Sequence, residues 1–178
     1  MHPTSIADLL TRAVAAKFRQ DLSQIVRCSG ILTTEELWTR PNEHCNSVAS
    51  LILHLTGNIT QWVIAGLHGE SFDRDRPAEF AAREQRPASE IVPPLESAVA
   101  RVTHIIGSLT ADQLVARYSI QGYDVSGVDV VYHVGEHFAF HTGQIVHITK
   151  AIRNVDLSLY DQHGRLRGVA GGKPYENL

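Results

Sequence analysis

Cysteine is scarce in this sequence, and its scarcity excludes two kinds of site. Among 178 residues there are two cysteines, Cys28 and Cys45, which cannot form the disulfide framework of a small secreted protein. They also lack the CxxC spacing of a thiolate metal site or a redox motif. We therefore expect both to be ordinary small side chains.

An excess of charge of one sign and long apolar runs are also lacking. The chain has 16 Lys and Arg against 19 Asp and Glu, so we expect no basic face that would attract nucleic acid or an anionic membrane. No apolar run approaches the roughly 20 residues that span a bilayer, and the N-terminal MHPTSIADLL has no signal-peptide core. These absences predict a cytoplasmic protein that binds neither nucleic acid nor membranes.

Strand alternation and internal repeats are missing as well, and the sequence shows helical periodicity instead. Four segments carry apolar residues at three- and four-residue spacings, and 43% hydrophobic residues suffice for one core. The pattern predicts an all-α four-helix bundle in a single domain, residues 1–160, followed by a mobile tail, residues 161–178, rich in glycine and charge. The four segments are 5–28, 47–67, 89–109 and 126–153.

Capping residues and prolines indicate where these helices begin. Pro93 and Pro94 fit only the first turn of a helix, so we expect the regular part of the third helix to begin near Pro93. Residues 68–87 carry charge and no period, which predicts a surface connection long enough to act as a lid. The expected caps and capping boxes are Thr33 with Glu36, Asn46 or Ser47, Thr110 with Gln113, and Ser126.

The segment HVGEHFAFHTGQI places His133, His137 and His141 four residues apart. At 100° per residue, the second and third lie about 40° and about 80° around the helix from the first, so all three form one stripe beside the apolar face. A buried polar group without a partner costs about 1–3 kcal/mol. The stripe therefore predicts that something satisfies these imidazoles.

A metal ion is one such partner. Imidazoles at positions i and i+4 can bind one ion, whereas His133 and His141 are about 12 Å apart along the helix and cannot. Spacing alone leaves open which neighbouring pair of the three binds. His54, alone in a leucine-rich face of the second helix, is the candidate third ligand, and three nitrogens with an open position are typical of catalytic zinc sites. The alternative is that these histidines only form hydrogen bonds within the core.

Other titratable residues offer little to such a site. Glu136 points some 60° or more away from the histidine stripe, which makes it a poor general base, and the sequence indicates no other carboxylate for that role. We expect ordinary surface roles for the remaining histidines, which are His2, His44, His68, His104, His147 and His163.

Two stretches of the chain resemble the DinB/YfiT-like superfamily of four-helix proteins. They are residues 46–66, with HLTGNITQW at their centre, and residues 128–150, with HVGEHFAFHTGQIVHITK. The ELW turn, YSIQGYDVSG and DLSLYD extend the likeness over nearly the whole chain, which is closest to a bacterial branch of mostly unknown function. In this superfamily a histidine of the second helix and an HxxxH ending just before a GQI-like segment bind a divalent metal. The matching positions are His54, His137 and His141.

With these ligands implied by the resemblance, three further residues become candidates for supporting roles. His133, one turn before the site, either supports a ligand or contacts substrate, with plain packing as the alternative. Asn58 and Gln144 lie one turn after His54 and His141 and could orient ligands or bound water through hydrogen bonds. Their alternative role is to satisfy each other's polar groups inside the bundle.

The resemblance also implies a chemistry. Characterised relatives use the metal to activate a low-molecular-weight thiol for transfer to an electrophile or for isomerising a small acid, which implies a metal-dependent S-transferase here. A small metal-dependent hydrolase is one alternative, and a non-catalytic, stress-associated bundle with a structural metal is another. We expect zinc or nickel, with iron also compatible, a small-molecule substrate such as a low-molecular-weight thiol, and a homodimer.

Overall fold

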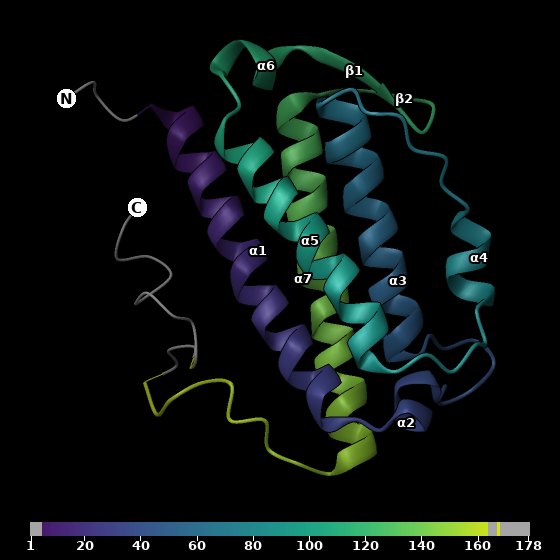
Figure 1. The fold of residues 1–178 in the computed structure, drawn as a ribbon. Helices are drawn as coiled ribbons and strands as arrows, with labels where there is room; N and C mark the ends of the chain where they lie inside the picture. Colours follow the sequence, from purple (N-terminus) through teal and green to yellow (C-terminus); the bar gives the residue numbers. More distant parts are fainter. Residues whose placement is uncertain (1–4, 164–166, 168–178) are drawn as a thin grey trace.

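Four long helices carry the periodic apolar residues of the chain and pack them against one another (Figure 1). The computed structural model describes residues 5–163 and 167. The all-α four-helix architecture is confirmed, whereas the single domain over residues 1–160 stays a prediction, and most of the proposed tail, residues 161–178, lies outside the described residues. The long helices are α1 (Ile6–Ile31), α3 (Val48–Ile59) with its π-helical continuation η1 (Thr60–Leu67), α5 (Ala88–Gly107) and α7 (Gly127–Arg153).

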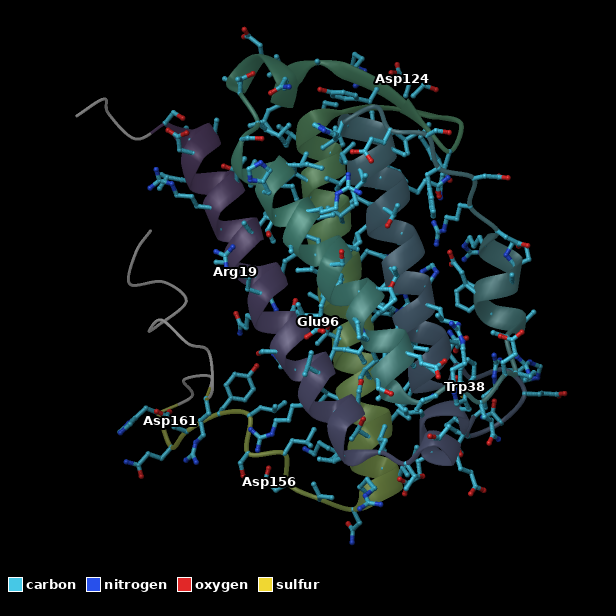
Figure 2. The ribbon with its side chains drawn as sticks, in the orientation of Figure 1. Arg19, Trp38, Glu96, Asp124, Asp156 and Asp161 are labelled. Carbon is cyan, nitrogen blue, oxygen red and sulfur yellow. The ribbon has the colours of Figure 1, made fainter. Side chains whose placement is uncertain are left out.

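The helices form a ring around one core. Helix α1 packs against α5 and α7, and α3 completes the ring by packing against the same two neighbours. The rings of Phe18 and Phe138 meet at the centre with centroids 4.7 Å apart. Charged side chains such as Arg19 on α1 and Glu96 on α5 are exposed on the outside (Figure 2). Each helix therefore buries one apolar face, as its periodicity predicted.

The expected helix caps are present. Ser47, rather than Asn46, caps α3, and Ser126 caps α7 through a capping box with Asp129. The capping boxes at Thr33 and Thr110 open the short helices α2 (Thr34–Trp38) and α6 (Ala111–Val115). A hydroxyl that accepts from the N3 amide satisfies one of the free N–H groups of the first turn, which is why these local signals were readable.

The prediction that regular helix begins near Pro93 was wrong. Helix α5 begins at Ala88 and contains Pro93 and Pro94 in its second turn. A proline there lacks the N–H that would bond to the carbonyl four residues earlier, which leaves the carbonyls of Ser89 and Glu90 without that bond. Both prolines and both of these residues are exposed, so water can solvate the two carbonyls.

Two elements were not predicted. Residues 68–87 were expected to be irregular but contain the helix α4 (Arg76–Ala81), which starts with Asp75 as its cap and lies beside α3 (Figure 1). Strands β1 (Arg117–Ile120) and β2 (Tyr123–Ser126) form an antiparallel hairpin at one end of the bundle. Its two-residue turn has positive φ at Gln121 (54°) and Gly122 (81°), as a type I′ turn requires.

The continuous helix Val48–Leu67 is the most apolar in the bundle. By length and composition alone it could cross a membrane, with a mean hydropathy of 1.3, so the expectation that no apolar run approached this length was wrong. Its most apolar window is, however, 72% buried inside the protein. A helix that is buried among its neighbours in a bundle is apolar on most of its sides, because most of its sides contact the core.

Helix α1 carries one buried charge with a consequence for pH. Asp21 is 1% exposed and pairs with Lys17, and one of its carboxylate oxygens has no hydrogen bond to any residue that the structure describes. Burial raises the pKa of Asp21 more than Lys17 lowers it. The folded state therefore binds this proton more tightly than the unfolded state, and the contribution to stability is full below the unfolded value of 3.8.

We expect this contribution to be lost as pH rises from 3.8 through the folded pKa of Asp21. The loss is about 1.4 kcal/mol for each pKa unit by which the folded value is raised. Urea denaturation of the wild type and of Asp21→Asn across pH 3–8 measures it, because the variant lacks the titrating group. A difference in unfolding free energy that stays constant with pH would contradict this assignment.

Candidate metal site

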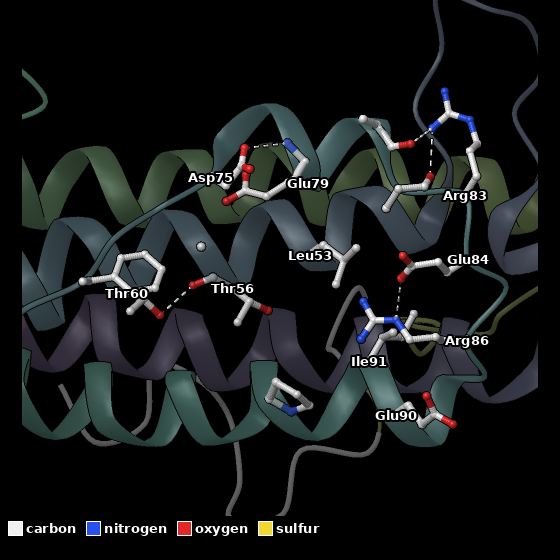
Figure 3. Close-up of a pocket in the computed structure, with 16 residues that line it drawn as sticks. Leu53, Thr56, Thr60, Asp75, Glu79, Arg83, Glu84, Arg86, Glu90 and Ile91 are labelled. Carbon is white, nitrogen blue, oxygen red and sulfur yellow. Dashed lines mark hydrogen bonds and ion pairs between the residues drawn. The ribbon is translucent and has the colours of Figure 1, made fainter.

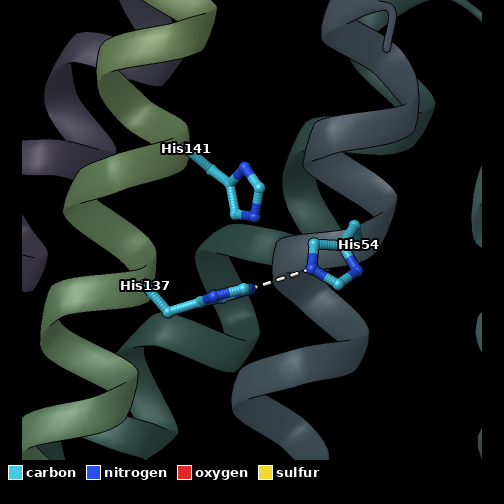
Figure 4. A group of neighbouring side chains, drawn as sticks. All are labelled: His54, His137 and His141. Carbon is cyan, nitrogen blue, oxygen red and sulfur yellow. Dashed lines mark hydrogen bonds between the residues drawn. The ribbon is translucent and has the colours of Figure 1, made fainter. Parts of the chain in front are cut away.

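Three histidines from two helices point toward one another. His54 projects from α3, and His137 and His141 project from adjacent turns of α7 (Figure 4). One ring nitrogen of each lies within 4.8 Å of the others, and the Nε2 atoms of His54 and His137 are 2.9 Å apart. The structure thus brings together the three predicted residues, and their role as metal ligands stays a prediction.

The spacing of two of these nitrogens, those of His54 and His137, fits one divalent ion. Two nitrogens that each lie about 2.0–2.1 Å from the same ion are about 2.9–3.4 Å apart for bond angles between 90° and the tetrahedral value. The separation of 2.9 Å between His54 and His137 falls at the lower end of that range. His54 and His141 face each other edge to face, with ring centroids 5.0 Å apart. The group could hold a metal after small adjustments of the rings.

Hydrogen bonds on the far side of two rings favour the tautomer that a metal needs. Nδ1 of His54 lies 3.0 Å from a carboxylate oxygen of Glu79, and Nδ1 of His141 lies 2.6 Å from Oε1 of Gln144. Both oxygens are acceptors, so each Nδ1 carries the proton and each Nε2 presents a lone pair toward the shared centre. Gln144 therefore contacts a candidate ligand, and its role in orienting that ligand stays a prediction.

A carboxylate that the sequence did not indicate lies beside the site. Glu79, in the unpredicted helix α4, binds both His54 and Arg74, and its side chain is 11% exposed. Burial alone would raise the pKa of Glu79, but the hydrogen bonds from Arg74 and His54 outweigh burial and hold it below its usual value. No local sequence signal identifies Glu79 as part of the site, because His54, the candidate ligand that it contacts, is 25 residues away in the chain.

Arg74 competes for the same ring nitrogen. Its Nη2 lies 3.2 Å from Nδ1 of His54, a contact that is a hydrogen bond only if Nδ1 has no proton. The carboxylate of Glu79 is nearer and charged, so the form with a protonated Nδ1 is favoured. Arg74 then serves chiefly as the ion-pair partner of Glu79.

Burial holds His133, His137 and His141 in the neutral form. Burial is the largest cause that lowers the pKa of His137, to about 3, and neighbouring His141 and His54 lower it further. Burial also lowers the pKa of His141 and of His133. A neutral imidazole is the form that binds metals, so these rings can bind without first losing a proton at neutral pH.

A cavity of about 430 Å³ opens beside His54 and His137. His133 lines it and is not one of the three clustered histidines, and its ring packs against Trp62 with centroids 4.3 Å apart. Asn58, 4% exposed, also lines the cavity, and its Oδ1 has no partner among the residues the structure describes. The remaining lining residues are Arg74, Arg76, Gln121, Tyr123, Val125 and Asp129.

Comparison with known proteins gives a family and a fold. The model of the family DUF1572, described as a protein of unknown function, matches residues 5–160. The structure is similar to that of a DinB-like protein, YjoA, from Bacillus subtilis, with a TM-score of 0.62 and 15% identity over 84% of this chain and 98% of that chain. It is also similar to that of a conserved protein from Enterococcus faecalis, with a TM-score of 0.61 and 16% identity over 87% of this chain and 99% of that chain. No curated protein matches the chain. At these identities the structural likeness shows the fold alone.

Proposed function

The chain belongs to the DUF1572 family, within the DinB-like superfamily, and on that basis we propose that it is a metal-dependent enzyme that acts on small molecules. His54, His137 and His141 would hold a divalent ion, with zinc or nickel the best candidates and iron compatible. The reaction we favour transfers a low-molecular-weight thiol to a small electrophile. The thiol sulfur bonds to the electrophilic carbon, the leaving group departs with its electron pair, and the thiol proton passes to solvent.

One observation supports a catalytic rather than a structural metal. Structural zinc sites are closed by four protein ligands, whereas catalytic sites keep a position open for substrate or water. Across residues 5–163 and 167, no fourth histidine, cysteine or carboxylate joins the three histidines. Glu79 lies on the opposite side of the His54 ring, and a cavity lies beside the cluster. The open position would therefore face a space large enough for a small substrate.

The bound ion would supply Lewis-acid chemistry, lowering the pKa of a thiol or water near it. The surrounding residues would bind and orient the substrate. Trp62 and His133 form an aromatic wall of the cavity, and Tyr123 stacks loosely on Trp62 with centroids 6.3 Å apart. Of the two roles considered for His133, we favour contact with substrate, because its ring faces this cavity. Asn58 would orient bound water or substrate beside His54.

The test combines metal-loaded protein, a panel of thiols and generic electrophiles. We expect turnover that requires both reactants and disappears with a chelator. We also expect His133→Ala to raise KM several-fold with less effect on bound metal. Hydrolysis without added thiol would favour the hydrolase alternative instead. Stoichiometric metal without any turnover, together with four protein ligands to the ion, would favour the structural alternative.

The small-molecule substrate and the homodimer follow from the same resemblance, whereas the other calls below rest on the charge and composition of the chain. We propose a small-molecule substrate, no nucleic-acid or membrane partner, a cytoplasmic location and a homodimer. An exposed aromatic side chain on α7, Tyr132 (69% exposed), is compatible with a subunit interface. Light scattering on the purified protein would give the molar mass directly, and a monomeric mass at micromolar concentration would reject the dimer.

A further inference from the structure

Residues 68–87, here called the strap, cross the outside of α3 and cover His54. Helix α4 within the strap packs beside α3, and the ring of Phe80 lies 4.7 Å from that of His54. Yet α4 has no buried residue, and a cavity of about 860 Å³ lies between the strap, α3 and the start of α5 (Figure 3). Apolar packing therefore contributes little to docking of the strap, and polar contacts must hold it.

The principal polar contact is a buried ion pair. Arg74 donates to Glu79 through Nε (2.6 Å) and Nη2 (2.8 Å), and through Nη1 to Gln61 of η1 (2.9 Å). The Arg74 side chain is 3% exposed and that of Glu79 is 11% exposed. Farther along the strap, Arg40 and Trp38 donate to backbone carbonyls of Phe80 and Arg86. Of these polar contacts, the Arg74–Glu79 pair is the one that also contacts a candidate metal ligand.

Gly57 provides the space for this pair. A Cβ at Gly57 would lie 2.0 Å from Oε1 of Glu79 and 3.0 Å from Nε of Arg74. Glycine weakens the interior of a helix, and it interrupts an otherwise strong apolar pattern in α3. Its presence is explained by the carboxylate that lies directly over the helix backbone, one turn from His54.

We propose that the strap positions the metal site: Glu79, seated over Gly57 and held by Arg74, fixes His54 with Nε2 toward the ion, so that metal binding and strap docking are coupled. This inference rests on the proposed metal site. When Nδ1 of His54 donates to Glu79, the ring cannot turn without losing a charge-assisted hydrogen bond. Coupling is reciprocal, so a bound ion must also favour the docked strap. Glu79 is thus a positioning residue.

Titration with Zn²⁺, Ni²⁺ and Co²⁺ tests the role of Glu79. We expect Glu79→Ala to weaken metal binding by about 10–100-fold. Glu79→Gln should recover part of this loss, because its amide oxygen still accepts from His54 although the ion pair with Arg74 is lost. If Glu79 acted only through its ion pair with Arg74, Glu79→Gln would weaken metal binding as much as Glu79→Ala. Glu70→Ala is the matched control, since it removes an exposed ion pair with Arg101 from the same strap and should leave affinity unchanged.

Gly57→Ala provides a second variant that keeps every ligand and Glu79 itself. The added methyl group should displace the Glu79 carboxylate, the end of a flexible side chain, rather than distort α3, and weaken metal binding by a similar factor. In a Glu79→Ala background the same change should have no further effect, because the space is then free. Gly30→Ala, in a helix with nothing within 4 Å of the added Cβ, is the control.

Limited trypsin digestion reports strap docking without relying on affinity. Cleavage after Arg74 or Arg83 should slow when wild type binds the ion and quicken in Gly57→Ala. If the wild type binds the ion and Glu79→Ala and Gly57→Ala bind it with the same affinity, the coupling is overturned and the metal site still stands. The same conclusion follows if the ion does not change the rate of trypsin cleavage. Failure of the wild type to bind any of the three ions would overturn both.

Discussion

A variant with alanine at His54, His137 and His141 is expected to purify without stoichiometric divalent metal, whereas the wild type carries about one ion per chain. The three nitrogens supply every candidate protein ligand in the described cluster, so removing them leaves nothing to hold the ion. Elemental analysis of both proteins, purified side by side and reloaded with zinc and nickel, measures the result and identifies the metal.

Single substitutions sharpen this prediction. Each of the three single alanine variants should lose more metal affinity than a variant that only removes a hydrogen bond to a ligand, for which the loss is roughly 10–100-fold. His147→Ala is the matched control, because His147 lies on the same helix, is exposed, and is not part of the cluster. Equal metal content in the triple variant and the wild type would reject the ligand set.

Phe138→Ala is expected to give the largest loss of stability among the core variants considered. Phe138 lies between His137 and His141 in sequence, is 1% exposed, and packs on Phe18 of α1. Removing a buried phenyl ring leaves a cavity that the neighbours fill only in part, which lowers the free energy of unfolding by about 3–5 kcal/mol. Urea denaturation of the metal-free protein measures this directly.

Two controls belong with that variant. Phe138→Leu keeps most of the volume and should cost less than about 1.5 kcal/mol, and Phe140→Ala, at a 58% exposed position, should change stability by less than about 0.5 kcal/mol. A Phe138→Ala loss no larger than that of Phe140→Ala would show that this face of α7 does not anchor the helix to the core.

Local signals predicted much of this molecule from sequence. Helical periodicity and capping boxes act within a few residues, so Ser47, Ser126 and the four long helices were readable without tertiary information. The stripe of three histidines was readable for the same reason, since i and i+4 positions share a helix face whatever else the chain does. Choosing His137 and His141 over His133 needed the resemblance, because spacing alone fits either pair.

The features that were missed depend on contacts between distant segments. Glu79 reaches His54 only because α4 docks on α3. Pro93 and Pro94 are tolerated because the carbonyls that they leave free belong to exposed residues, which water can solvate. The hairpin has strands of four residues each, too short for a clear alternation, and its signal lay in the Gln121–Gly122 pair. Gly57 interrupts the apolar pattern of α3, but the reason for a glycine there becomes clear only from the position of Glu79.

A crystal structure of the metal-loaded protein, with diffraction recorded at the absorption edge of the bound element, tests the metal site most directly. We predict one anomalous peak about 2.0–2.3 Å from a ring nitrogen of His54, His137 and His141, with a remaining position directed at the cavity beside His133. A peak elsewhere, a fourth protein ligand closing the site, or no peak in protein that contains the metal would contradict it.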